Sequence, residues 1–399
     1  MSDELTQALQ SLFVAALVAA LAPVIVGIAP RLRTPQVVVL IVGGVIVGPQ
    51  VLGLAEPDSI ELLSNVGLGF LFLLAGYELE LSLFRQRAGK LAIIGWLASA
   101  AIAGLLVAVL TSTGLVRAYI PVALGLTTTA LGTLLPILRD NNMLRGAFGS
   151  YLMAGGAVGE FFPVIAIAIF LGSNGRFFGL LSLLAVAVIA LILSLIPKLG
   201  RGGRLQQILR EGQGATAQTT LRWTVAMLLL LLLIANAFGL DAVLGAFLAG
   251  VVLRRWAPGD LKSLEEKLDA VGYGFFIPVF FAVSGMNLDL ESIVHEPARL
   301  ALFFVLFLVV RGLPTLLVYR SALPRPQRLE LLFLLATALP LLVALAEIGL
   351  ETGEMLPENA AALVGAGVLS VMIFPGIAVA IDRRMAAARD ADAVTGSPL

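Results

Sequence analysis

Long runs of apolar residues, separated by short polar segments, divide the chain almost from end to end. A helix that crosses the hydrocarbon core of a membrane needs about 20 mostly apolar residues. By that criterion the sequence predicts about 13 membrane spans, numbered here in chain order. They cover residues 6–29, 36–54, 60–77, 90–113, 118–138, 148–173, 176–197, 219–238, 240–254, 269–288, 298–319, 328–348 and 357–381. The predicted fold class is all-α, a polytopic membrane protein.

The composition agrees with a single membrane domain over residues 1–399. Apolar residues make up 59% of the chain and charged residues 13%, whereas soluble domains are about 45–50% apolar and about 25% charged. The net charge of zero argues against a nucleic-acid partner. The lack of cysteine excludes disulfides and thiolate metal sites. Residues 1–10 lack the basic start of a signal peptide, so we expect the first span to be retained.

Basic residues fall almost entirely on one side of the predicted membrane. They gather in the segments after spans 1, 3, 5, 7, 9, 11 and 13, whereas the opposite loops contain only Arg117, Arg176 and Arg299. Because positive charge accumulates on the cytoplasmic side, the N-terminus is predicted outside and the C-terminus in the cytoplasm. We expect a bacterial-type inner membrane.

Short motifs recur at a nearly constant distance along the chain. The segment 66–70 of span 3 returns at 271–275 in span 10, and 129–131 of span 5 returns at 337–339 in span 12. Spans 3 and 10 are predicted to run in opposite directions. The pattern therefore predicts an inverted repeat, typical of transporters in which discontinuous helices from both halves form a binding site near the midplane.

Glu160 lies near the centre of span 6, and Arg311 lies inside span 11. A charge at this depth is costly and usually lines an ion or proton path. Because burial generally favours the neutral carboxyl group, an acid such as Glu160 can exchange a proton for a cation. The alternative is a permanent structural ion pair with Arg311. Arg311 itself could pair with Glu160, bind the carbonyls of a broken helix or serve as a structural anchor.

Span 5 contains Thr127, Thr128 and Thr129 between glycines and Pro136, a composition that weakens a helix. Unwound carbonyls and hydroxyls would supply oxygen ligands for an alkali cation. The alternative is that each threonine bonds back to its own helix. Thr337 and Pro340 in span 12 match this pattern, and together the two spans favour a pair of broken helices.

Two further polar sites are weaker candidates. Glu78, at the end of span 3, is either an interfacial charge or part of a route for cations. Ser284 in span 10 could suggest a membrane serine protease, but His295, the only histidine, is predicted in a loop. We therefore expect that the protein is not an enzyme.

Four glycine-rich apolar segments, at 35–49, 71–80, 245–250 and 280–286, resemble the cation:proton antiporter-2 family of sodium/proton exchanger-like membrane domains. The resemblance covers nearly the whole chain. It implies a sodium/proton-antiporter fold with crossed broken helices, a homodimer, and exchange by an elevator-like movement. It also implies a scaffold and dimer part at 1–89 and 176–288, and a mobile core part at 90–175 and 298–382.

The same resemblance assigns roles to particular residues. Thr128 and Thr129 fall on the unwound region of the family and Glu160 on its ion-binding acid. Many relatives carry an acidic or amide residue where this chain has Gly159, and electrogenic relatives carry a lysine that span 10 lacks. A cytosolic regulatory domain follows the last span in many relatives. We expect none here, so any such regulation would come from a separate subunit.

The main hypothesis is electroneutral exchange of a monovalent cation, Na⁺ or K⁺, for H⁺, with cation and proton competing at Glu160. Two alternatives stay open: a cation channel subunit, and a sodium-coupled symporter of an organic anion on a similar fold. The repeat and the isolated acid favour a carrier, because a channel more naturally shows a filter loop or a ring of charges. No cofactor is expected, and membrane lipid is the expected surrounding.

Overall fold

The computed structural model describes residues 3–28, 35–78, 84–116, 119–170, 188, 218–237, 242–256 and 261–395. Every regular element within these residues is helical, and none of them is a strand. The predicted all-α class is therefore confirmed. Apart from residue 188, the predicted span 176–197 lies outside the described residues.

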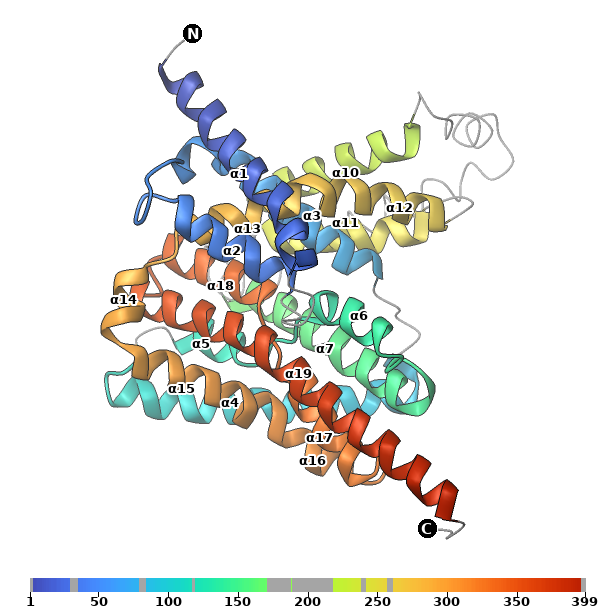
Figure 1. Cartoon of the computed structure of the whole chain (residues 1–399). Coiled ribbons are helices and arrows are strands. Elements are labelled where there is room, and N and C mark those ends of the chain that lie inside the picture. The colour runs from blue at the N-terminus through green and yellow to red at the C-terminus, as the bar shows by residue number, and fades with distance from the viewer. Residues whose placement is uncertain are drawn as a thin grey trace. The chain divides into compact units, whose positions relative to one another are not determined.

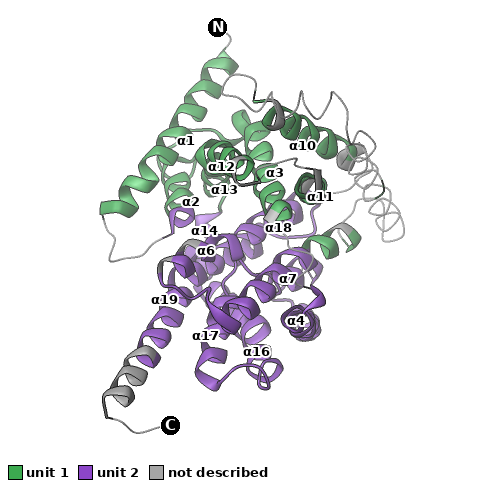
Figure 2. Ribbon diagram, turned by 90° about the vertical axis from the view of Figure 1, so that its right-hand side faces the viewer, with its two compact units in different colours: residues 1–28, 39–79, 164–288 green, residues 29–38, 80–163, 289–399 purple. Residues whose placement is uncertain are grey.

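The helices form two compact units, which Figure 2 shows in different colours. Unit 1 comprises residues 1–28, 39–79 and 164–288, and unit 2 comprises residues 29–38, 80–163 and 289–399. Each unit combines segments that are far apart in the sequence.

Unit 1 consists mainly of apolar helices. Its elements, of which Figure 1 labels the α-helices, are α1 (Asp3–Ile28), most of α2 (Gln36–Val47), the short η2 (Pro57–Ile60), α3 (Glu61–Glu78), α10 (Thr219–Ala237), α11 (Ala242–Trp256), α12 (Leu261–Val271), η4 (Gly272–Phe276) and α13 (Ile277–Met286). The predicted spans 219–238 and 240–254 thus correspond to two separate helices, α10 and α11.

Glycines bring α3 and α11 of unit 1 into close contact. A Cβ atom at Gly76 of α3 would overlap the carbonyl oxygen of Phe247 in α11, and one at Gly250 of α11 would overlap the carbonyl oxygen of Leu73. Small residues allow helix backbones to approach this closely inside a membrane. Two of the glycine-rich segments that carried the family resemblance are therefore the contact surface between these helices.

Unit 2 contains the two interrupted helices. Its elements are α4 (Arg87–Ser112), α5 (Tyr119–Gly125), α6 (Leu131–Asp140), α7 (Gly146–Phe170, as far as Pro163), α14 (Leu290–His295), α15 (Pro297–Phe307), η5 (Leu308–Gly312), α16 (Leu313–Val318), α17 (Arg325–Leu335), α18 (Pro340–Glu351) and α19 (Pro357–Thr395). Buried side chains of α6, α7, α17 and α19 form one apolar core in this unit.

Eight helices within the described residues are long and apolar enough to cross a membrane, and three shorter apolar helices accompany them. The longer segments are Asp3–Ile28, Pro57–Tyr77, Arg87–Ser112, Gly146–Ile167, Leu264–Met286, Pro297–Val318, Arg325–Glu351 and Pro357–Met385. The segment Arg325–Glu351 spans α17 and α18 together. The predicted span 118–138 is not among the eight, and residues 126–130 divide it into α5, of 7 residues, and α6, of 10 residues. The chain is a multi-pass membrane protein.

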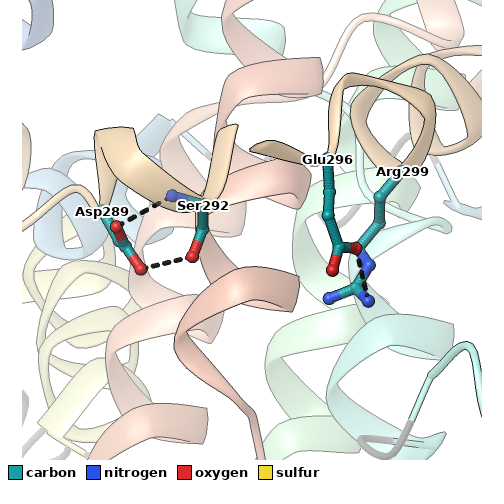
Figure 3. A network of polar contacts seen from close by, with 4 residues as sticks. All are labelled: Asp289, Ser292, Glu296 and Arg299. Carbon is teal, nitrogen blue, oxygen red and sulfur yellow. Dashed lines mark hydrogen bonds and ion pairs between the residues drawn. The ribbon is translucent and has the colours of Figure 1, made fainter. Parts of the chain in front are cut away.

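A short polar helix, α14, joins two of the long apolar helices. The Asp289 carboxylate caps its first turn, accepting hydrogen bonds from the backbone N–H of Ser292 at 3.1 Å and from its hydroxyl at 2.5 Å (Figure 3). Glu296 and Arg299 form an ion pair at 2.7 Å where α15 begins (Figure 3). His295 is the last residue of α14 and not part of a loop, which corrects the prediction for this position.

Candidate ion-binding site

The first helix interruption lies between α5 and α6, where the sequence predicts it. The hydroxyls of Thr127 and Thr128 donate to the carbonyl oxygens of Leu124 and Gly125, three residues earlier, at 2.8 Å each. Their backbone N–H groups donate to the same two carbonyls. These two threonines therefore close the last turn of α5 locally, as the back-bonding alternative predicted.

The second interruption lies between α17 and α18. Residues 337–339 are not helical, and Pro340 opens α18 at a position where its missing N–H costs no helical hydrogen bond. The Thr337 hydroxyl donates to the carbonyl oxygen of Phe333 at 3.0 Å. On the other side, the backbone N–H of Ala338 donates to the Ser370 hydroxyl of α19 at 3.1 Å.

The two interruptions meet. The backbone N–H of Ala130 donates to the carbonyl oxygen of Thr337 at 2.8 Å, and the Thr129 hydroxyl donates to the carbonyl oxygen of Leu335 at 2.7 Å. Backbone groups freed by each break are thus satisfied by the other, as they must be where water is scarce. The predicted crossing of two broken helices is confirmed.

Helix α7 joins this crossing through Gly159. The Gly159 carbonyl oxygen accepts a hydrogen bond from the backbone N–H of Thr129 at 3.1 Å. It is available because the residue four positions later is Pro163, which has no N–H to donate. A Cβ atom at position 159 would lie 2.5 Å from Oγ1 of Thr129 and 2.8 Å from Nη2 of Arg311. Glycine is therefore required for this close approach.

Arg311 is buried in the π-helical segment η5 beside the crossing. Its Nε donates to Oγ1 of Thr129 at 3.0 Å, and its Nη2 donates to the carbonyl oxygen of Gly155 in α7 at 2.7 Å. We expected that Arg311 could bind the carbonyls of a broken helix, but its bond to the broken helix goes to a hydroxyl, and the carbonyl that it binds belongs to α7. The guanidinium therefore connects the unwound segment between α5 and α6, through Thr129, to the backbone of α7, through Gly155.

Glu160 follows Gly159 on α7 and is half-buried. Its Oε1 accepts a hydrogen bond from the backbone N–H of Gly132, in the first turn of α6, at 3.3 Å. The N-cap residue of α6 is Ala130, whose side chain cannot cap the helix. The carboxylate of Glu160 takes that place from α7, where the positive end of the α6 dipole favours a negative charge.

Ser284 and Glu78 belong to the other unit. Ser284 lies on α13 and Glu78 ends α3, and both belong to unit 1, whereas every residue of the crossing belongs to unit 2. Sequence reasoning did not single out Gly155, Leu335 or Ser370. Two of them contribute carbonyl groups, which have no signature in the sequence, and Ser370 was visible only as an isolated hydroxyl in an apolar span.

Two interrupted helices that cross among membrane-length apolar helices characterise the sodium/proton-antiporter fold. The chain belongs to the transmembrane sodium/hydrogen exchanger family, whose profile matches residues 14–381. This is a family of transporters and not of enzymes.

Individual relatives agree with that membership. The Bacillus subtilis protein YjbQ is 27% identical over 383 residues, which are 92% of this chain and 62% of that protein. The glutathione-regulated potassium-efflux system protein KefC of Klebsiella pneumoniae is 28% identical over 327 residues, 77% of this chain and 50% of KefC. The chain thus spans between half and two thirds of the length of these relatives.

A solved structure shares the fold. The sodium proton antiporter MjNhaP1 of Methanocaldococcus jannaschii matches with a TM-score of 0.64 and 18% sequence identity, covering 96% of this chain and 97% of that chain.

Proposed function

We propose that this protein exchanges a monovalent cation for protons across the membrane, and that cation and proton compete for the carboxylate of Glu160. The observation that carries the proposal is the position of this acid, half-buried against the first turn of α6 and next to the crossing of two interrupted helices. Family membership and the names of its relatives, which include a sodium proton antiporter and a potassium-efflux system protein, support the same activity.

The competition follows from the chemistry of a carboxylate at membrane depth. The ionised group is stabilised by the α6 terminus and can bind an alkali cation, while the protonated group is neutral and less costly to hold in the membrane. Because the same carboxylate binds the cation and the proton, the carrier crosses the membrane with one or the other bound. Each cation moved in one direction therefore allows a proton to move in the other.

Arg311 gives the site a fixed positive charge that does not titrate in the working range. Its bonds to Thr129 and Gly155 hold the unwound segment against α7, the helix that carries Glu160. With one titrating carboxylate, the site has the same net charge when it holds a proton or a monovalent cation. We therefore propose an electroneutral exchange.

The remaining parts of the proposal concern the assembly. Residues 1–89 and 176–288 would form the scaffold and dimer part, and 90–175 and 298–382 the core that moves during alternating access. The interruptions of α5/α6 and α17/α18 would be counterparts in an inverted repeat. The protein would work as a homodimer in a bacterial-type inner membrane, with the C-terminus in the cytoplasm and no cofactor besides the transported ions.

Everted membrane vesicles from cells lacking their own exchangers test this function. A pH-sensitive dye should report proton movement when Na⁺ or K⁺ is added, and vesicles containing Glu160→Gln should show none. A cation flux that collapses an imposed voltage without coupled proton movement would instead indicate a channel. Sodium-dependent uptake of an organic anion would indicate a symporter.

A further inference from the structure

Helix α19 packs against both halves of the second interrupted helix, α17 and α18. Ser370 of α19 lies at the break between them and is completely buried. Its hydroxyl oxygen accepts a hydrogen bond from the backbone N–H of Ala338 at 3.1 Å and lies 3.0 Å from the carbonyl oxygen of the same residue. One hydroxyl group of α19 therefore reaches both backbone groups of an unwound residue.

The hydroxyl proton of Ser370 has a second acceptor within reach, the carbonyl oxygen of Gly367 at 2.7 Å. Gly367 lies inside α19, where its carbonyl also accepts a backbone N–H from one turn further along the helix. Ala338 is fully buried and lies outside the helices. Because backbone groups must find partners where water is scarce, the hydroxyl matters more to Ala338 than to Gly367.

The turn of α19 that carries Ser370 also contacts Ala338 through Gly367. A Cβ atom at position 367 would lie 2.9 Å from the carbonyl oxygen of Ala338 and 2.8 Å from Cδ1 of Leu342. The carbonyl group of Ala338 thus lies against one turn of α19, between a hydroxyl and a glycine. This contact leaves the unwound residue little freedom to move.

A continuous series of contacts joins Ala338 to the proposed binding site. The preceding residue, Thr337, accepts the backbone N–H of Ala130 on its carbonyl oxygen at 2.8 Å. Ala130 is the N-cap residue of α6, and the N–H of Gly132 in the first turn donates to Oε1 of Glu160 at 3.3 Å. That last bond is longer than the usual range of about 2.7–3.2 Å, so a small shift of the α6 start would break it.

We propose that Ser370 is a positioning residue for cation binding, because it fixes Ala338 and thereby the contact that holds the start of α6 at Glu160. The inference rests on the exchange function proposed above. A site that is ordered before the ion arrives loses less conformational freedom on binding and therefore binds more tightly. Once the cation is bound, its own contacts order the site, so Ser370 should affect affinity more than the rate of the saturated carrier.

Cation–proton exchange in proteoliposomes, measured against cation concentration, tests this role. The cation is whichever of Na⁺ and K⁺ the wild-type protein exchanges, and the pH is fixed and alkaline, so that protons compete least. For Ser370→Ala we expect the apparent KM for the cation to rise about tenfold, as for the loss of a buried hydrogen bond. The maximal rate per folded protein should stay close to that of wild type.

Ser99→Ala is the matched control. Ser99 is as buried as Ser370 and lies in α4 of the same unit, but its hydroxyl bonds to Gly95 of its own helix at 3.0 Å. Its removal should leave KM unchanged. If Ser370 merely stabilised the fold, its loss would leave fewer working carriers, which lowers the maximal rate and does not change KM.

A second variant acts on Ala338 while the hydroxyl stays in place. Gly367→Ala adds a methyl group against the carbonyl oxygen of Ala338 and should also raise KM. Gly365→Ala, on the same helix, is its control, because the new atom would meet the side chains of Leu300 and Ile293 instead. If Ser370→Ala does not accumulate in the membrane, the comparison of these two glycine variants decides.

The role of Ser370 is wrong if Ser370→Ala keeps the wild-type KM, whether or not the maximal rate falls. It is equally wrong if Gly367→Ala and Gly365→Ala have the same KM. A wild-type protein without cation–proton exchange would overturn the proposed function itself, whereas the comparisons of variants concern Ser370 and its contact with Ala338.

Discussion

The side-chain oxygen of Thr129 accepts a hydrogen bond from Nε of Arg311 at 3.0 Å, although the two residues are 182 positions apart in the sequence. The same hydroxyl donates to the carbonyl oxygen of Leu335 at 2.7 Å. The backbone N–H of Thr129 donates to the carbonyl oxygen of Gly159. One threonine therefore joins the unwound segment to η5, α17 and α7. Its neighbours Thr127 and Thr128 bond only within α5 through their hydroxyls.

Replacing Thr129 by valine should destabilise the protein more than replacing Thr128. Thr129→Val leaves a buried arginine N–H and a buried carbonyl without their partner, which costs about 1–3 kcal/mol for each group. Thr128→Val removes the hydroxyl's bond to the carbonyl oxygen of Gly125, but that oxygen still accepts the backbone N–H of residue 128. Thermal unfolding in detergent compares the two variants, and Thr129→Ser should restore most of the stability. Equal effects of the two valine substitutions would show that the crossing does not depend on this hydroxyl.

Glu160→Gln should abolish cation-dependent proton movement while the protein still accumulates in the membrane. Glutamine keeps the shape and can still accept from the backbone N–H of Gly132, but it cannot bind and release a proton. Dye assays in everted vesicles measure the loss. Glu61→Gln, at the exposed start of α3, is the matched control and should retain exchange. Normal exchange by Glu160→Gln would place the binding site elsewhere.

Gly159→Ala should impair both stability and exchange. The added methyl group would lie 2.5 Å from Oγ1 of Thr129 and 2.8 Å from Nη2 of Arg311, so the crossing must open to accept it. Overpacking of this kind costs about 1–3 kcal/mol. Gly376→Ala in α19, where nothing lies within 4 Å of the new atom, is the control and should be neutral or slightly stabilising. A Gly159→Ala protein as stable as wild type would contradict the described packing.

Arg311→Ala should reduce stability and exchange more than Arg311→Lys. Lysine keeps the charge but lacks the planar fork that reaches Thr129 and Gly155 at once. A double-mutant cycle with Glu160→Gln, read in thermal unfolding, measures whether the two charges also act on each other. We expect a coupling of at least about 0.5 kcal/mol, since both side chains belong to the same crossing. Additive effects would mean that Arg311 acts only through its hydrogen bonds.

Membrane potential should not drive the exchange. Each elementary charge moved would couple to about 2.3 kcal/mol per 100 mV, and a single carboxylate that binds either ion moves none. Proteoliposomes with a potassium–valinomycin potential, assayed with sodium, should show rates independent of voltage. A steady exchange current on a solid-supported membrane would overturn the single-carboxylate scheme.

Much of the architecture was readable from the sequence, because it depends on local properties. Apolar runs of membrane length predicted the long helices, and threonine, glycine and proline predicted the interruptions before Leu131 and Pro340. Glu160 was singled out because a charge inside an apolar span is costly wherever the helix packs. The long helices, their interruptions and the buried acid can each be predicted from one segment of the chain and the membrane around it.

The partners within the site were decided only by the tertiary structure. Three adjacent threonines look alike in the sequence, yet only the hydroxyl of Thr129 reaches another helix. The sequence left open which groups Arg311 binds, and the packing of η5 against α7 gives it the carbonyl of Gly155. Hydrogen bonds between distant residues depend on how helices cross, and a carbonyl group is the same in every residue. For that reason local pattern predicts where a helix breaks, but only packing selects what the broken ends bind.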